Sequence, residues 1–235
     1  MVQKSSPDAP EAPPRRRGRP RAFEAETALA QAMDVFWRDG FAGASLDDVS
    51  AATGLNRPSL YGAFGDKRAL YLKAYGQYRR RMNEMFLPLF QARAPLRAKL
   101  RRILIAALDL YLSGEDGPRG CFTVLSAASD AIADPELRGL VAEAIASVDR
   151  AFGRLFADAR DAGELPAAAD PRRLARMASA TLHTLSVRAR ARIPRAEILP
   201  IVDDAVVTIC GVKGRRLAQT APAAVRAASR RSSPA

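Results

Sequence analysis

The stretch 45–64 constrains the fold more than any other part of this sequence. It contains two short segments with helical apolar spacing on either side of Gly54, where glycine can adopt a turn conformation that would strain a side chain. The small residue Ser50 lies where the two segments would touch, and Leu60 can pack back against Val49. A small residue, a glycine and an apolar residue at these offsets predict a helix-turn-helix.

Polar residues mark where these short helices begin. Ser45 is followed three positions later by Asp48, which resembles a capping box although the acid is Asp rather than Glu. Asn56 can cap the second helix, with Pro58 tolerated in its first turn. The second helix then exposes hydrogen-bonding side chains with little charge, which suit base edges and phosphates in a DNA major groove. These side chains are Asn56, Arg57, Ser59 and Tyr61.

The rest of the chain between its two ends also has helical character. Apolar residues recur at the spacing of one helix face, as at Leu29, Ala32 and Met33. Asp134-Pro135 and Asp170-Pro171 each predict a capping Asp with Pro at the first helical position. There is no run of alternating β-branched residues with hairpin turns. We therefore predict an all-α fold of about nine helices.

Positive charge is concentrated at the two ends of the chain. The sequence has 37 Lys and Arg against 25 Asp and Glu, a formal net charge of +12. Residues 1–21 carry +4 and residues 213–235 carry +6, so the 191 residues between them carry only +2. Both ends are rich in Pro, Ala and Ser, which predicts disorder. A nearly neutral body with cationic ends indicates a polyanionic partner.

Two cysteines and one histidine exclude several classes of protein. Cys121 and Cys210 cannot form a disulfide framework or a cysteine-rich metal site, and His183 alone excludes His-clustered zinc or iron chemistry. We therefore expect no metal and no cofactor. No apolar run reaches the roughly 18 residues of a membrane span, and the N-terminus lacks the apolar stretch of a secretory signal. We expect a cytoplasmic protein with reduced thiols and no membrane association.

The first third of the chain carries a specific set of motifs. They are Gly18-Arg19-Pro20-Arg21, Phe36-Trp37-Arg38-Asp39-Gly40-Phe41, Ser45, Val49, Thr53-Gly54-Leu55 and the run 59–70. Together they resemble the TetR/AcrR family of bacterial transcriptional regulators. The resemblance covers residues 20–80, and Gly120-Cys121 and Asp134-Pro135-Glu136 extend it weakly. Gly62-Ala63 departs from the pattern, because the family commonly has aromatic or polar residues there.

The resemblance implies how the chain is divided. A disordered basic arm, residues 1–20, precedes a helix-turn-helix DNA-binding domain at 21–81, with the helix-turn-helix itself at 45–64. A larger helical domain for ligand binding and dimerisation follows at 82–212, and a disordered basic tail occupies 213–235. The implied partners are a double-stranded DNA operator, a small-molecule effector and a second copy of the chain.

The resemblance also implies roles for individual residues. The hydroxyl and amide of Ser45 would meet a phosphate, Tyr61 a phosphate or a thymine methyl group, and Lys67 the DNA backbone. A helix N-terminus and a lysine both favour phosphate, which agrees with these roles. Arginines of the arm can enter a minor groove, although a solubilising tail is the alternative. The remaining DNA-binding candidates are Asn56, Arg57, Pro58 and Ser59 in the second helix, and Arg15, Arg16, Arg17 and Arg19 in the arm.

Candidates for effector binding lie in the second domain. Aromatic side chains with a few polar groups are typical of an apolar ligand pocket, although ordinary core packing is the alternative for each of them. The candidates are Phe86, Phe90, Tyr111, Cys121, Phe122 and His183. Cys121 follows Arg119-Gly120 at a predicted helix start, so it is also a candidate redox sensor, with a small buried apolar role as the alternative.

Helices predicted at 171–190 and 196–211 are candidates for a dimer interface. Small residues allow close approach, and two such helices from each of two chains make a four-helix contact; an internal pair of core helices is the alternative. We expect Val206 to face the partner, together with Ile198, Val202 and Ile209.

These features predict a ligand-responsive, DNA-binding transcriptional regulator, a repressor released from a palindromic operator by a small molecule. One alternative is a nucleoid-type protein that binds DNA without sequence preference through its basic ends. The other is an enzyme with Cys121 as nucleophile or His183 as base, but no catalytic motif supports it, and we expect no catalytic residue.

Overall fold

The computed structural model describes residues 21–114 and 116–211. These residues form nine α-helices and one π-helical turn, with no strand among them, so the prediction of an all-α fold is confirmed for this part of the chain. The elements are α1 (Arg21–Gly43), α2 (Leu46–Thr53), α3 (Arg57–Phe64), α4 (Lys67–Gln91), α5 (Leu96–Leu112), η1 (Thr123–Ala127), α6 (Ala128–Asp130), α7 (Pro135–Asp161), α8 (Pro171–Arg190) and α9 (Arg195–Cys210).

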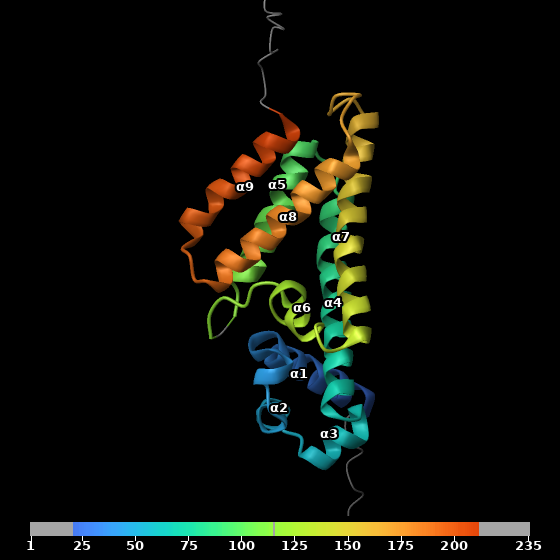
Figure 1. The fold of residues 1–235 in the computed structure, drawn as a ribbon, viewed down its shortest axis with the longest axis vertical. Coiled ribbons are helices and arrows are strands. Elements are labelled where there is room, and N and C mark those ends of the chain that lie inside the picture. Colours follow the sequence, from blue (N-terminus) through green and yellow to red (C-terminus); the bar gives the residue numbers. More distant parts are fainter. Residues whose placement is uncertain (1–20, 115, 212–235) are drawn as a thin grey trace, which may run out of the picture.

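The helices form two groups at opposite ends of the molecule, and the long helix α4 connects them (Figure 1). Helices α1, α2 and α3 lie together at one end, and α4 runs from this end alongside α7 (Figure 1). Helices α5, α8 and α9 pack at the other end, and the short α6 lies at the junction. The predicted caps Asp134 and Asp170 begin α7 and α8, each accepting a backbone N–H bond and each followed by Pro.

Aromatic rings form the core of the first end. Phe36 on α1 meets Tyr71 on α4 with ring centroids 5.0 Å apart, and Trp37 meets Tyr78 at 4.9 Å, both edge to face. Phe122, which immediately precedes η1, packs its ring against the rings of Trp37, Tyr71, Tyr75 and Tyr78. This ring cluster ties α1 and α4 to the segment between α5 and η1.

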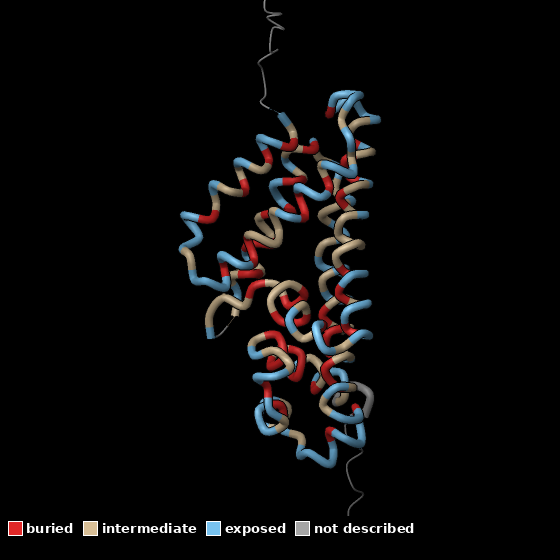
Figure 2. Tube along the Cα trace, viewed as in Figure 1, coloured by how far each residue is buried: buried red, intermediate tan, exposed pale blue. Residues whose placement is uncertain are grey.

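Aliphatic side chains form the core of the second end. Buried residues of α5 such as Leu100, Ile103 and Leu104 pack with Phe152 and Phe156 of α7 and with residues of α8 and α9. The buried positions of α5, α8 and α9 face inward toward one another, and their outer faces are exposed (Figure 2).

The inner face of α9 corrects one prediction. Ile198, Val202, Val206 and Ile209 are all buried in the core of their own chain. The expectation that Val206 faces a partner chain is therefore wrong, and the alternative of an internal core pair holds for this face. The apolar side chains that α8 and α9 leave exposed are different ones, namely Met177, Val187 and Val207.

Candidate nucleic-acid interface

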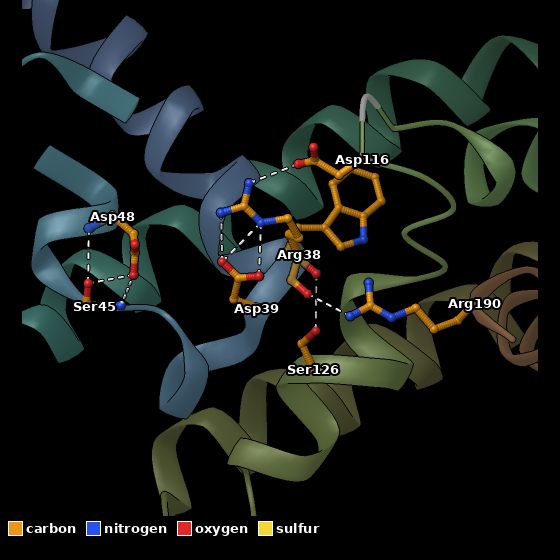
Figure 3. A network of polar contacts seen from close by, with 8 residues as sticks. Arg38, Asp39, Ser45, Asp48, Asp116, Ser126 and Arg190 are labelled. Carbon is orange, nitrogen blue, oxygen red and sulfur yellow. Dashed lines mark hydrogen bonds and ion pairs between the residues drawn. The ribbon is translucent and has the colours of Figure 1, made fainter. Parts of the chain in front are cut away.

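The first helix of the predicted helix-turn-helix begins in a capping box. The Ser45 hydroxyl oxygen accepts the backbone N–H of Asp48 at 3.0 Å, and the Asp48 carboxylate accepts the Ser45 backbone N–H at 2.8 Å (Figure 3). The Ser45 hydroxyl also donates to this carboxylate, and these bonds lower the pKa of Asp48. The capping box is confirmed with Asp in the place of Glu, and it engages both Ser45 groups that the sequence assigned to a phosphate.

The turn between the two helices has the geometry that the sequence predicts. Gly54 has φ +68° and ψ 8°, the left-handed conformation that glycine adopts without strain, and its N–H donates to the Ser50 carbonyl at 2.9 Å. Val49 and Leu60 are both buried in the same core. The Ser50 hydroxyl oxygen is also buried, with no hydrogen-bond partner among the described residues.

The second helix, α3, is fixed at both of its ends. The Asn56 side-chain oxygen accepts the Ser59 N–H at 2.9 Å at the start of α3, and Pro58 lies in the first turn. The Lys73 ammonium donates to the Phe64 carbonyl at 2.9 Å at its end. Only Leu60 and Phe64 of α3 are buried, and Arg57, Pro58, Ser59 and Tyr61 are exposed on this short helix. Their exposure makes these four side chains accessible to another molecule.

Arg57 makes a two-pronged ion pair across the turn. Its Nε–H donates to Asp47 Oδ1 at 2.9 Å and its Nη2 to Asp47 Oδ2 at 2.6 Å, and this pairing raises the pKa of Arg57. Both side chains remain largely exposed, 55% for Arg57 and 73% for Asp47. Sequence reasoning missed this partner, because nothing in the spacing of ten residues indicates which acid on α2 reaches the start of α3.

The start of α4 adds two basic side chains beside the helix-turn-helix. Lys67 lies 4.5 Å from the centre of the Phe41 ring and is partly exposed. Arg68 instead pairs with Asp134 and Glu136 at the start of α7, at 2.7 and 2.8 Å. Lys67 thus stays a candidate for DNA contact, whereas Arg68 fastens the two domains together. The arm candidates Arg15, Arg16, Arg17 and Arg19 lie outside the described residues.

Comparisons with known proteins agree with this geometry. Residues 28–74 match the family model described as bacterial regulatory proteins, tetR family, and residues 97–197 match the model of a tetracyclin repressor-like C-terminal domain. A solved structure of the TetR family regulator CifR, a cysteine mutant complexed with 26-bp double-strand operator DNA, is 32% identical with a TM-score of 0.70, over 80% of this chain and 98% of that one. The chain belongs to the TetR family.

A relative and a solved structure at lower sequence identity are also similar to this chain. The HTH-type transcriptional repressor ComR of Escherichia coli is 27% identical over 175 residues, which is 74% of this chain and 83% of ComR. A TetR family regulator from Agrobacterium tumefaciens has the same fold, with a TM-score of 0.71 at 22% identity, over 80% of this chain and 98% of that one. As a TetR-family member, this chain is a DNA-binding transcriptional regulator that acts as a homodimer.

The DNA-binding end of this TetR-family regulator is joined to the second domain by polar contacts. The Trp37 indole N–H donates to the Gly120 carbonyl at 3.0 Å. Arg190 on α8 donates to the Arg38 carbonyl at 2.7 Å (Figure 3). Asp116, in the loop after α5, accepts from Arg38 at 3.1 Å. Sequence reasoning found none of these pairs, because each joins residues more than 70 positions apart.

A carboxylate from α6 makes a second polar link at the junction. Asp130 accepts the Tyr71 hydroxyl at 2.6 Å and the Phe41 backbone N–H at 3.0 Å. Burial and the nearby Asp130 carboxylate raise the pKa of Tyr71, so the phenol stays protonated and donates this bond. Helix α6 is thereby bonded to both α1 and α4, the two helices that carry the helix-turn-helix.

The six effector candidates do not all gather at one site, although Tyr111, Cys121 and Phe122 lie together around Tyr78. Phe122 belongs to the ring cluster of the DNA-binding end, whereas Phe86 and Phe90 pack on the second core. Tyr111 is buried in that second core, and Cys121 lies 3.3 Å from the Tyr78 hydroxyl. Two surface hollows are lined by other residues, one between α4 and α5 and one at the junction around Arg38 and Asp116.

The remaining effector candidate is His183, on α8. It is half-buried on α8 next to Asp149 of α7, and burial lowers its pKa although Asp149 acts in the opposite direction. One Asp149 carboxylate oxygen is buried without a hydrogen-bond partner in the described part of the chain. In residues 21–114 and 116–211, no cluster of three or more His, Cys, Asp or Glu is placed to hold a metal ion, and no helix is long and apolar enough to span a membrane.

Proposed function

We propose that this regulator is a repressor that binds a palindromic operator through α3 and leaves it when a small molecule binds the second domain. The observation that carries the proposal is the capped, rigidly turned pair α2 and α3, which exposes hydrogen-bonding side chains on α3. The TetR-family regulator CifR, solved in complex with operator DNA, supports the same use of this fold. ComR is likewise described as a repressor.

Individual side chains have the following proposed roles. Arg57 and Ser59 contact base edges, because both are exposed in the first turn of α3, the end that enters a major groove in helix-turn-helix proteins. Tyr61 lies one turn later and is 49% exposed, which suits a phosphate or a thymine methyl group. Asn56 retains its amide N–H groups while its oxygen caps α3. Lys67 contacts the backbone, as do the arm arginines.

A phosphate contact at Ser45 would compete with bonds that Ser45 already makes. Its hydroxyl and amide both bond to Asp48, so a phosphate at the start of α2 would have to displace that carboxylate. The helix N-terminus remains favourable for an anion, but the neighbouring Asp48 charge opposes it. We therefore assign Ser45 chiefly to holding α2 in place, with Asn56 in the matching position on α3.

Release by an effector follows from symmetry and from the junction contacts. A dimer holds two α3 helices one DNA turn apart, so any change in the angle between the two ends alters their spacing. Asp130, Gly120 and Arg190 bond the second domain to α1 and α4, and any shift of those elements therefore moves the helix-turn-helix. A small molecule that prefers the altered spacing lowers operator affinity by its differential binding.

Selection of bound DNA from a random-sequence library tests the proposal directly. The full chain is expected to enrich a palindrome with two half-sites about one helical turn apart. A gel-shift titration should then give a Kd for this operator at least about a thousandfold below that for random duplex at the same salt. Equal affinity for the selected and random duplexes would reject sequence-specific regulation and favour the nucleoid-type alternative.

The basic ends are the one feature that favours that alternative. Deleting residues 1–19 removes Lys4 and four arginines. If they contact DNA, the truncated chain should show a shallower dependence of log Kd on log salt, by about 0.9 for each lost phosphate contact. If the enriched palindrome is still preferred after this deletion, the ends add affinity and α3 adds selectivity.

A further inference from the structure

The helix-turn-helix has a charge that a DNA-binding surface does not ordinarily have. Residues 45–66, which comprise the helix-turn-helix at 45–64 and the Asp66 cap of α4, contain three aspartates and one arginine, a formal net charge of −2, in a chain whose total is +12. Phosphates repel such a segment, and general attraction must come from elsewhere in the chain. Each acid in this segment therefore requires a structural or a functional reason to be there.

Two of the three acids have a local structural reason. Asp48 completes the capping box of α2 with Ser45. Asp66 caps α4 by accepting the Ala69 N–H at 2.7 Å. Asp47 makes neither kind of contact, and its carboxylate instead accepts two hydrogen bonds from Arg57 on the other helix of the motif.

The edge of Arg57 that Asp47 occupies leaves another edge open. A guanidinium has five N–H donors in a fixed fork. Asp47 takes one donor each from Nε and Nη2, along one side of the fork. The two Nη1 donors and the second Nη2 donor are not used by this carboxylate, and one Nη1 donor together with the second Nη2 donor forms the end of the fork. That end matches the O6 and N7 acceptors of guanine, the commonest specific contact in a major groove.

We propose that Asp47 is a positioning residue that determines specificity: it orients Arg57 for a guanine and neutralises its charge toward phosphates. The inference rests on the proposed function, because it requires that α3 enters a major groove. Orientation reduces the loss of side-chain freedom when Arg57 binds its base, which favours the operator. Neutralisation removes the attraction of Arg57 for any phosphate, which disfavours random DNA. Both effects widen the gap between the two affinities.

The variant Asp47→Asn tests both effects in the full chain. Kd for the selected operator is expected to rise about threefold to tenfold, because an exposed arginine must now be ordered on binding. Kd for a random duplex is expected to fall by up to about fivefold, with a salt dependence steeper by about one phosphate contact. Preference at a single guanine of each half-site should relax, and preference elsewhere should stay.

A matched control and a rescue separate this role from general effects. Glu143→Gln removes one exposed negative charge that pairs with Arg150 on α7, so it makes the same change in net charge outside the helix-turn-helix. Because exposed salt bridges contribute little, this variant should change the Kd for the operator and the Kd for the random duplex by no more than about twofold each. Asp47→Glu keeps the negative charge, so random duplex should bind to it as weakly as to wild type. The guanine preference should be recovered only in part.

A double variant shows whether Asp47 acts through Arg57. In an Arg57→Ala background, Asp47→Asn should no longer change the guanine preference and should no longer weaken operator binding. If Asp47→Asn weakens the operator equally in that background, the route through Arg57 is wrong. If wild type and Asp47→Asn prefer the operator over the random duplex equally, the role assigned to Asp47 is wrong and the proposed function stands. If wild type does not discriminate at all, the proposed function fails and the inference fails with it.

Discussion

The two ends of this molecule are stabilised in different ways. At the DNA-binding end, α2 and α3 have eight residues each, and side-chain caps and a left-handed glycine fix where they begin and end. At the other end, α7 and α8 are long, and buried aliphatic and aromatic side chains from four helices hold them together. Short helices are marginal on their own, so caps matter most where packing area is smallest.

This difference predicts which substitutions affect DNA binding and which affect the stability of the fold. A change at an exposed position of α3 should alter DNA binding with little effect on the fold, and a change at a cap should cost about 1 kcal/mol of stability. A change inside the second core should alter the fold itself. The predictions below test this contrast, beginning with the largest expected effect.

The second core should not tolerate a charge on the inner face of α9. Val206 is 2% exposed and packs in its own chain, so Val206→Asp buries an unpaired carboxylate and should destabilise the chain by about 3–5 kcal/mol. Urea unfolding followed by circular dichroism measures this loss.

The next residue along α9 provides the matched control. Val207 is 39% exposed, and Val207→Asp should leave the chain folded but weaken the dimer, if the exposed apolar side chains of α8 and α9 meet a partner as the dimer prediction requires. Sedimentation velocity measures the dimer. If Val206→Asp unfolds no more easily than Val207→Asp, the assignment of the inner face is wrong.

Helix α3 should show the opposite behaviour. Arg57→Ala removes an exposed side chain and should weaken operator binding by about 1–3 kcal/mol, with the melting temperature nearly unchanged. Fluorescence anisotropy with a labelled operator measures the affinity. Arg150→Ala removes a comparably exposed arginine from α7 and serves as the control. Wild-type operator affinity in Arg57→Ala would remove Arg57 from the interface.

The cap of α2 should produce an intermediate effect on stability. Ser45→Ala removes the side-chain acceptor for the Asp48 N–H and should cost about 1 kcal/mol of unfolding free energy. Ser59→Ala, on the exposed face of α3, should change stability by less than about 0.5 kcal/mol. Equal stability losses for the two serine variants would show that the capping box contributes nothing.

The smallest effect is expected at the link between Arg68 and Asp134, and it depends on pH. Hydrogen bonds from Arg68 and from the Leu137 N–H lower the pKa of Asp134 from 3.8 to about 2. A lowered folded-state pKa contributes stability above pH 3.8, and this contribution is lost as the pH falls toward 2. Asp134→Asn should therefore be slightly less stable than wild type at pH 7, and the difference should shrink below pH 3.8. A constant difference across this range would contradict the pairing.

Local rules made the DNA-binding end predictable from sequence. The offsets among Ser50, Gly54 and Leu60 gave the turn, and Ser45 and Asn56 gave the helix starts, because each depends on neighbours within a few positions. Helix boundaries in the second domain also followed from Asp134 and Asp170. The facing of Val206 did not, because a helix that is apolar on one side gives no indication whether its own chain or a partner covers that side.

Contacts between distant residues were beyond sequence reasoning. Arg57 was identified as a DNA-binding candidate, but its partner Asp47 depends on the angle between α2 and α3. The bonds from Trp37 to Gly120 and from Tyr71 to Asp130 depend on how the two domains meet. The six effector candidates were chosen by residue type alone, and packing distributes them over both cores and the junction.

The central claim is that two α3 helices, held at a fixed spacing by the dimer, read two half-sites of one operator. The most direct test inserts base pairs between the half-sites of the selected palindrome and measures Kd for the full chain. An insertion of about half a helical turn should weaken binding at least tenfold, because it rotates one half-site to the opposite side of the duplex. An affinity that does not depend on this spacing would contradict the claim, whatever the affinity for the original operator.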